Sequence, residues 1–77
     1  MINGFEDQLI NKYDKFWMYK KIYELDELSK NVVILRIESN LEFSEIAKIL
    51  NKSEVYVRVI FYRAKEKIKK MNKEENL

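Results

Sequence analysis

The sequence FSEIAKILNKSEVYVRVIFYRAKEKIKK, residues 43–70, contains two amphipathic segments separated by Asn51-Lys52-Ser53. In the first segment, apolar residues recur at helical spacing from Phe43 to Leu50. In the second, four apolar residues follow at steps of four, three and four, so they fall within about 60° of one another around a helix. They are Val57, Phe61, Ala64 and Ile68. Two helices joined by so short a turn predict a helix-turn-helix over residues 43–70.

The segment before this unit predicts a buried helix that ends near Glu38. Apolar residues lie on most of its sides: Leu28, Val32, Val33, Ile34, Leu35 and Ile37. A helix of this kind must be covered by more than one neighbour, so we expect it at the centre of the domain. Asn40 and Asn51 are expected to end helices in the left-handed conformation. Ser53, and either Asp26 or Ser29, are expected to cap the helices that follow them.

The N-terminal residues 5–24 predict an amphipathic helix or linker. Its apolar positions are Phe5, Leu9, Tyr13, Phe16 or Trp17, and Ile22 or Tyr23. Aromatic residues gather near its end, at Phe16, Trp17, Tyr19 and Tyr23. Either they pack in the core and on the next helix, or they form an exposed patch that docks on a partner chain. Periodicity does not separate these two interpretations.

Length and composition predict one small all-α domain. The chain has 77 residues, no Pro, one Gly and no alternating apolar run that would indicate a strand. We therefore expect a four-helix domain over residues 1–77 with a C-terminal helix-turn-helix, winged-helix-like but without a wing. In this division, residues 5–24 are the N-terminal helix, residues 27–70 the helix-turn-helix domain, and residues 71–77 a frayed tail.

The absence of certain residue types argues against several classes of function. The chain has neither Cys nor His, so it lacks the usual zinc ligands, the Cys nucleophile and the His acid-base catalyst. We expect no enzyme activity, no metal and no cofactor. The longest apolar run, residues 32–35, is far shorter than a membrane span, and the N-terminus shows no secretion-signal pattern. We therefore expect a cytoplasmic protein without a membrane partner.

Positive charge is concentrated in the half that contains the helix-turn-helix. Residues 43–77 carry nine basic and five acidic residues, a net charge of +4, whereas residues 1–42 carry six basic and eight acidic residues, a net charge of −2. Lysines near the end of the last helix are explained by the helix dipole alone. Arg58 and Arg63 lie in the middle of that helix, where this explanation does not apply. Their placement is typical of a nucleic-acid reader.

The face of the last helix opposite the apolar stripe supplies the candidate binding residues. Arg forks onto guanine or grips phosphate, Val methyls contact the thymine methyl, and Tyr hydrogen-bonds phosphate. Ser53 and the free N–H groups at the helix start can hold one phosphate. Two other interpretations stay open: Val55 and Val59 pack on another protein or on the N-terminal helix, or Arg63 pairs with Glu66 or Glu45.

Residues 28–70 resemble region 4 of bacterial RNA polymerase sigma factors of the sigma-70 family, particularly the extracytoplasmic-function group. Val33-Ile34-Leu35-Arg36 matches the first part of the family pattern. The second part is matched, at unbroken spacing, by Leu41, Glu45-Ile46-Ala47, Ile49-Leu50, Ser53, Val57-Arg58, Phe61, Arg63-Ala64-Lys65 and Ile68. Asn40 and Asn51 replace glycines of the pattern, and Glu42 replaces its capping Ser.

Further departures affect the binding surface. Lys52 stands at an apolar turn position, and Val59 and Ile60 stand where Ser and Arg are common. The loss of that Arg removes one DNA contact, so the family's promoter preference is not carried over. A sigma factor of this kind also has a region 2, which these residues do not contain. The chain is then either a C-terminal domain of such a factor or a stand-alone relative.

The resemblance implies a compact helical domain whose last helix enters the major groove of the minus-35 promoter element. Its earlier helices would hold the flap of the RNA polymerase β subunit, and an anti-sigma factor is a further implied partner. The residues that would face DNA are Ser53, Val55, Tyr56, Arg58, Val59, Tyr62 and Arg63, with Arg36 on a phosphate. We expect a monomer in isolation.

Two other functions fit part of the sequence. A module of the same fold could bind polymerase or a regulator without reading DNA, which the outward Val55 and Val59 favour. A small repressor would need a dimer interface, for which the patch of Phe16 and Trp17 is the candidate.

Overall fold

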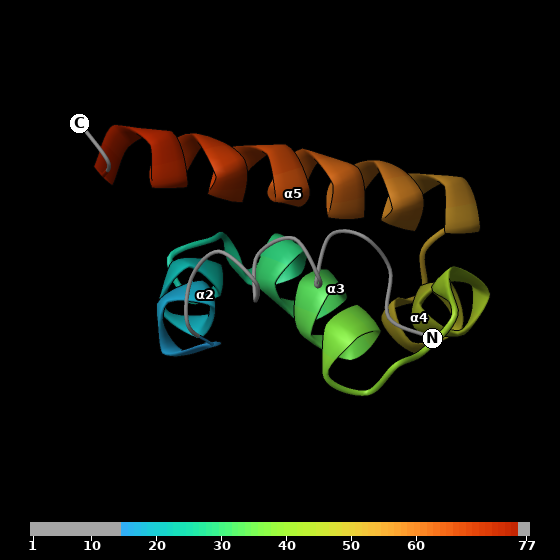
Figure 1. Ribbon diagram of the computed structural model, residues 1–77. Coiled ribbons are helices and arrows are strands. Elements are labelled where there is room, and N and C mark those ends of the chain that lie inside the picture. Colours follow the sequence, from blue (N-terminus) through green and yellow to red (C-terminus); the bar gives the residue numbers. More distant parts are fainter. Residues whose placement is uncertain (1–14, 76–77) are drawn as a thin grey trace.

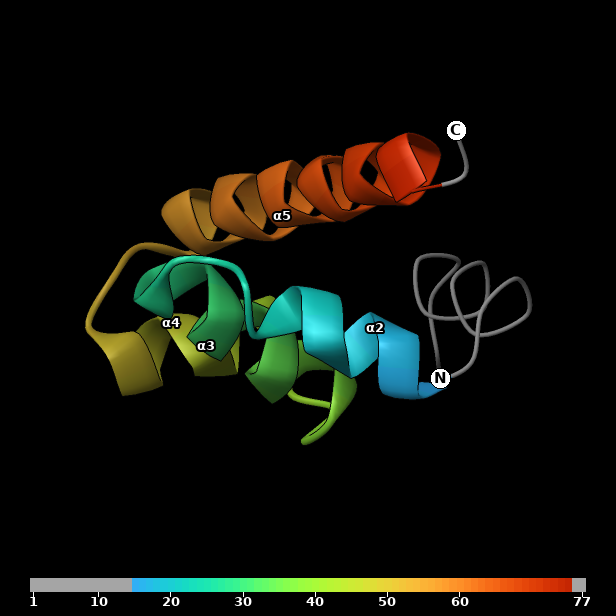
Figure 2. The same cartoon turned by 90° about the vertical axis from the view of Figure 1, so that its left-hand side faces the viewer.

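The computed structural model describes residues 15–75 (Figure 1), which form the helices α2 (Lys15–Ile22), α3 (Glu27–Ile37), α4 (Phe43–Leu50) and α5 (Glu54–Glu75). No strand occurs among these residues, which confirms the all-α prediction. The long helix α5 lies across one side of the molecule and contacts α2, α3 and α4 beneath it (Figures 1 and 2). The predictions for Phe5, Leu9 and Tyr13 lie outside the described residues. None of the described helices is both long and apolar enough to cross a membrane.

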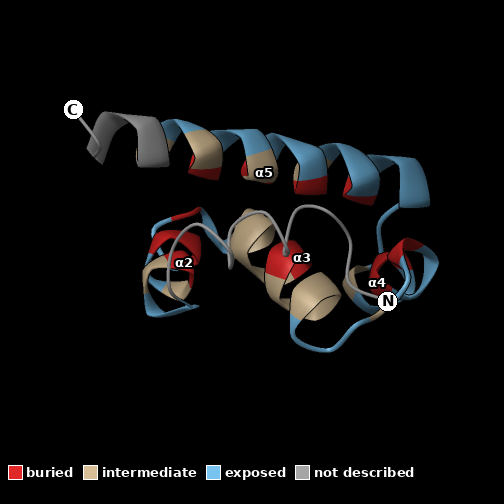
Figure 3. Ribbon diagram, in the orientation of Figure 1, coloured by how far each residue is buried: buried red, intermediate tan, exposed pale blue. Residues whose placement is uncertain are grey.

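The apolar stripe predicted on the last helix forms the centre of the core. Val57, Phe61 and Ile68 are completely buried and Ala64 almost completely. Figure 3 shows the buried positions of α5 on the side that faces the other helices, and the exposed positions on the opposite side. Burial of these side chains fixes the rotation of α5, and with it the residues that point to solvent.

The helix α3 is central, as its composition predicts. It contacts α2, α4 and α5. Val32 and Val33, which point in different directions around the helix, are both completely buried. Its other apolar residues, from Leu28 to Ile37, are half-buried and pack against the same core.

The ends of the helices follow from polar residues and two asparagines. Asp26 accepts a hydrogen bond from the Ser29 N–H at 3.1 Å, and Ser53 Oγ accepts one from the Tyr56 N–H at 3.1 Å. The Asp26 pKa is lowered, mainly because the Ser29 N–H stabilises the charged carboxylate. Asn40 and Asn51 both have positive φ, 55° and 57°, as expected of helix terminators.

The start of α4 is capped by a glutamate instead of the Ser, Thr, Asp or Asn that usually caps a helix. Glu42 is its N-cap. Its backbone N–H donates to Glu45 Oε1 at 2.8 Å, so Glu45 reaches back from the first turn of α4 to the capping residue.

The end of the N-terminal helix buries Ile22, as predicted, but its other buried residues were not predicted. Met18, Ile22 and Leu25 enter the core at steps of four and three, whereas 77% of Phe16 is exposed and Tyr23 is also exposed. Trp17 is half-buried against the core, and so is Tyr19, whose hydroxyl donates to Glu38. Trp17 and Tyr19 therefore fit the packing interpretation, and Phe16 and Tyr23 the exposed one.

The last helix is longer than the sequence predicts. It continues to Glu75, beyond the end near Lys70 and into the stretch expected to be a frayed tail. Residues 71–75 include no Gly or Pro, so nothing in their chemistry stops the helix. Met71 also packs against the core.

Candidate nucleic-acid interface

The solvent face of α5 brings the predicted binding residues together. Because the stripe around Val57 faces inward, residues about half a helical turn away face outward. Val55 is 71% exposed. The other predicted residues of α5 and of the turn before it are exposed as well: Ser53, Tyr56, Arg58, Val59, Tyr62 and Arg63. They form one continuous surface, which we call the α5 outer face.

Arg58 is the most constrained cation of the α5 outer face. Its guanidinium Nη2 lies 2.6 Å from Glu54 Oε2, one turn earlier on the same helix. Its Cζ also lies 4.9 Å from the centroid of the Phe43 ring on α4. The side chain remains 51% exposed, so a ligand has access to it.

Arg63 is placed differently. Within the described part of the chain it forms no ion pair, so neither Glu66 nor Glu45 neutralises it. Glu66 instead lies 3.9 Å from Lys69. Arg63 lines a shallow hollow between α5 and the start of α3, together with Ser29. The guanidinium is therefore available to an anionic ligand.

Two tyrosines of the α5 outer face each have a lysine nearby. The Lys52 ammonium lies 5.6 Å from the Tyr56 ring centroid, and the Lys65 ammonium lies 5.6 Å from that of Tyr62. Tyr62 also packs edge-on against Phe61, with ring centroids 5.2 Å apart. Each tyrosine ring thus has a positive charge near it, and both a tyrosine hydroxyl and a lysine ammonium are groups that bind phosphate oxygens.

Arg36 lies apart from this surface. It is half-buried on α3, donates an N–H to the Leu41 carbonyl oxygen at 2.8 Å, and its Cζ lies 4.7 Å from the Phe43 ring centroid. The structure therefore gives it a contact that holds the loop between α3 and α4. Four of its five N–H donors are not needed for that bond.

Sequence reasoning missed two participants in the site. Glu54 had a detectable signal, because a Glu four residues before an Arg on a helix is a common ion pair. Phe43 had none, because its contacts with Arg36 and Arg58 depend on how three helices pack. Nothing among the described residues gathers three or more potential metal ligands.

Comparison with known proteins gives a match to a protein family. The family model described as "Sigma-70, region 4" matches residues 22–70, which covers more than half of the chain and includes α3, α4 and the first part of α5. No curated protein and no solved structure matches the chain.

Proposed function

Because this chain belongs to the sigma-70 region 4 family, a family of DNA-binding domains that act in transcription initiation, we propose that its α5 outer face reads the minus-35 element of a promoter. The observation that carries this proposal is the exposure of Val55, Arg58, Val59, Tyr62 and Arg63 on one side of a single helix. An α-helix fits the major groove of B-DNA, and these residue types offer donors, acceptors and methyl groups to base edges and phosphates.

The proposed contacts follow from the position of each residue. Arg58 and Arg63 contact guanine or phosphate, while Val55 and Val59 contact thymine methyl groups. Tyr56, Tyr62 and the hydroxyl of Ser53 contact phosphates at the edge of the groove. Arg36 is a secondary candidate for a phosphate, because its bond to Leu41 leaves other donors.

The family also suggests the partners. We propose that α3 and α4 hold the flap of the RNA polymerase β subunit, and that the domain works in the cytoplasm as a monomer of the extracytoplasmic-function type. An anti-sigma factor is the regulator that such a surface would meet. Membership of this family also gives no reason to expect an enzyme.

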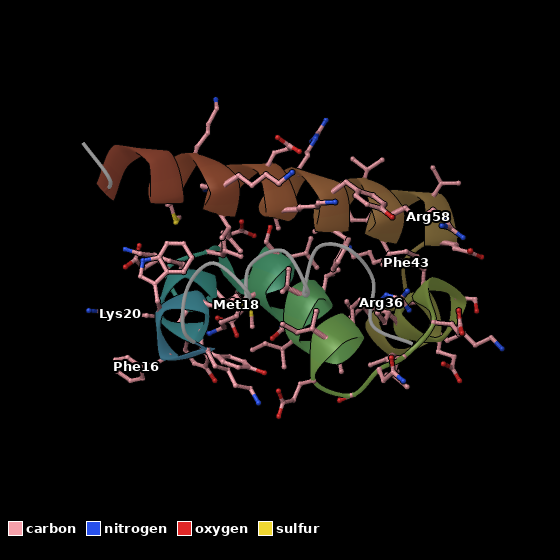
Figure 4. The ribbon with its side chains drawn as sticks, in the orientation of Figure 1. Phe16, Met18, Lys20, Arg36, Phe43 and Arg58 are labelled. Carbon is pink, nitrogen blue, oxygen red and sulfur yellow. The ribbon has the colours of Figure 1, made fainter. Side chains whose placement is uncertain are left out.

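A fluorescence anisotropy titration with a DNA duplex tests the proposal. The duplex is selected from a random pool for binding to the wild-type chain at low salt. R58A and R63A should each weaken binding by about five- to twentyfold, the effect of one lost charged contact. Lys20→Ala is the matched control, since it removes the same charge from α2, at the opposite end of the molecule from Arg58 (Figure 4). It should change the affinity by less than about twofold. A random pool that yields no duplex bound by the wild type at low salt contradicts the proposal.

One feature favours a second candidate function. Val55, Val59, Tyr56 and Tyr62 give the α5 outer face more exposed apolar surface than phosphate contacts require, and 59% of Ile49 on α4 is also exposed. Such a surface suits a polymerase subunit or a regulator. A chain that binds core polymerase but no DNA would support this function.

A further inference from the structure

The ring of Phe43 lies where α3, α4 and α5 meet. Phe43 is the first residue of α4, and only 7% of it is exposed. Its ring centroid lies 5.3 Å from that of Phe61, with an angle of 65° between the rings, and 6.1 Å from that of Tyr62. Because Phe61 is completely buried, these contacts hold the Phe43 ring in one place.

Two guanidinium groups approach this one ring. The Cζ of Arg36 lies 4.7 Å from the ring centroid and that of Arg58 lies 4.9 Å from it. Figure 4 shows Phe43 between the two arginines. A guanidinium is planar, delocalised and weakly hydrated, so it stacks on aromatic faces more readily than an ammonium does. The fixed ring therefore fixes the positions of both charges.

The two arginines differ in what they can still bind. Arg36 is half-buried and donates to the Leu41 carbonyl, so it serves the loop between α3 and α4. Arg58 is half-exposed, and its partner Glu54 is also exposed, at 44% of its side chain. An exposed ion pair contributes little to stability, so a DNA group can replace Glu54 at low cost.

The ring contact and the hydrogen bonds use different parts of the Arg58 side chain. Contact with a ring uses the flat face of the guanidinium, while the N–H groups at its edge remain directed at other partners. Phe43 can therefore keep its contact while the edge passes from Glu54 to a base or a phosphate. An arginine held in this way loses less conformational freedom on binding than a free one.

We propose that Phe43 is a positioning residue for Arg58: the buried ring holds the guanidinium so that its N–H edge meets DNA. This inference rests on the proposed function, since it takes Arg58 as a DNA contact. It goes further because it makes the affinity of the α5 outer face depend on a residue that is buried, lies on another helix and touches no DNA.

A double-mutant cycle on the full chain tests this inference by anisotropy, with the duplex selected above. F43L should bind about three- to tenfold more weakly than the wild type, and F43Y, which keeps the ring, should stay within about twofold. In the R58A background, F43L should lose most of its effect, and the remainder comes from the contacts of the ring with Arg36 and Tyr62. In the R63A background, which serves as the matched control, the two losses should multiply, because Arg63 has no ring contact in the described part of the chain.

The outcomes separate this inference from the proposed function. Losses that multiply for F43L and R58A overturn the positioning role and leave DNA binding by α5 intact. A wild type that binds no DNA overturns both. Circular dichroism shows whether F43L folds. Should it not fold, nuclear Overhauser contacts between the Phe43 ring and the Arg58 side chain decide the question in the wild type alone. We expect them in the free and in the DNA-bound chain, and their absence from the bound chain overturns the inference.

Discussion

Glu54 holds the Arg58 guanidinium in an ion pair in the free protein. The two side chains lie one turn apart at the start of α5, and their charged atoms are 2.6 Å from each other. Glu54 also places a negative charge on the helix end that the proposed function turns towards a phosphate backbone. Glu54 nevertheless stabilises α5 itself, because a carboxylate in the first turn interacts favourably with the helix dipole.

Glu54→Gln should therefore strengthen DNA binding and weaken the fold slightly. We expect about two- to fivefold tighter binding by anisotropy, because the change removes a repulsive charge and frees Arg58. We expect a loss of about 0.3–1 kcal/mol in the free energy of unfolding from the helix dipole. Glu66→Gln is the control, since Glu66 pairs with Lys69 farther along α5 and should change affinity less. Weaker binding by Glu54→Gln would mean that Glu54 itself contacts the DNA.

At the scale of the elements, short polar signals set where each helix begins and ends. Asp26 caps α3, Glu45 reaches back to Glu42 at the start of α4, and Ser53 caps α5. Each signal lies within three residues of its target; the sequence indicated the caps at Asp26 and Ser53 but not the contact between Glu42 and Glu45. These ends fix the turn that sets the angle between α4 and α5, and hence the orientation of the α5 outer face.

The cap of α3 gives the fold a pH dependence. Asp26→Asn should lower the free energy of unfolding at pH 7 by about 0.3–1 kcal/mol, because an amide still accepts the Ser29 N–H but lacks the negative charge that interacts favourably with the helix dipole. The Asp26 pKa is lower in the folded chain than in the unfolded one. The Asp26 charge therefore contributes fully to the free energy of unfolding above the unfolded pKa of about 4. This contribution is lost as the pH falls through the folded pKa.

Urea denaturation of the wild type and of Asp26→Asn at pH 7 and near pH 2.5 measures the free energy of unfolding of each protein. The difference in unfolding free energy between the two proteins should be smaller at the lower pH. Glu66→Gln is the control, because Glu66 lies in the middle of α5, away from both helix ends, and pairs with Lys69 at the surface with 3.9 Å between the charged atoms, so it should change stability little at either pH. A difference in unfolding free energy that does not change with pH would show that the Asp26 charge does not contribute to the cap.

The turn between α4 and α5 depends on a left-handed residue. Asn51 has φ 57° and ψ 48°, a conformation that costs most residues about 1–2 kcal/mol and Gly almost nothing. Asn51→Ala should therefore lower the unfolding free energy by about 1 kcal/mol, and Asn51→Gly should leave it equal or higher. Thermal denaturation compares the two. Equal stability of the Ala and Gly variants would contradict this conformation of the turn.

At the scale of the whole molecule, most of the net positive charge of the described residues lies on α5. Residues 54–75 carry seven basic and four acidic residues, a net charge of +3, whereas residues 15–53 carry seven basic and six acidic residues, a net charge of +1. The structure places α5 on one side of the other three described helices, so this charge lies on the side that carries the α5 outer face (Figure 2). Such a charge attracts nucleic acid and makes its binding depend on salt.

We expect α5 to neutralise about three or four phosphates, so the affinity should fall by about 40- to 150-fold between 50 and 200 mM salt. R63A should reduce the slope of the logarithm of affinity against that of salt by about one, if Arg63 contacts a phosphate. Lys20→Ala should leave the slope unchanged. An affinity independent of salt would point to apolar contacts through Val55 and Val59 instead.

Most of the fold could be predicted from the sequence, because the patterns that indicate it are local or periodic. The stripe from Val57 to Ile68 and the asparagine terminators needed only their neighbours in the chain. In α2, aromatic residues stand at adjacent positions of a short helix, so periodicity did not reveal that Met18 enters the core and Phe16 does not. The contacts of Phe43 with Arg36 and Arg58 arise from packing between helices, which no local pattern indicates.

Binding of DNA by the α5 outer face can be observed residue by residue in a titration of the ¹⁵N-labelled chain with the selected duplex. Amide chemical shifts should change at Ser53, Val55, Arg58, Tyr62 and Arg63, while those of α2, around Phe16 and Lys20, should stay in place. Shift changes centred on α2, with those of α5 unaffected, would contradict the account.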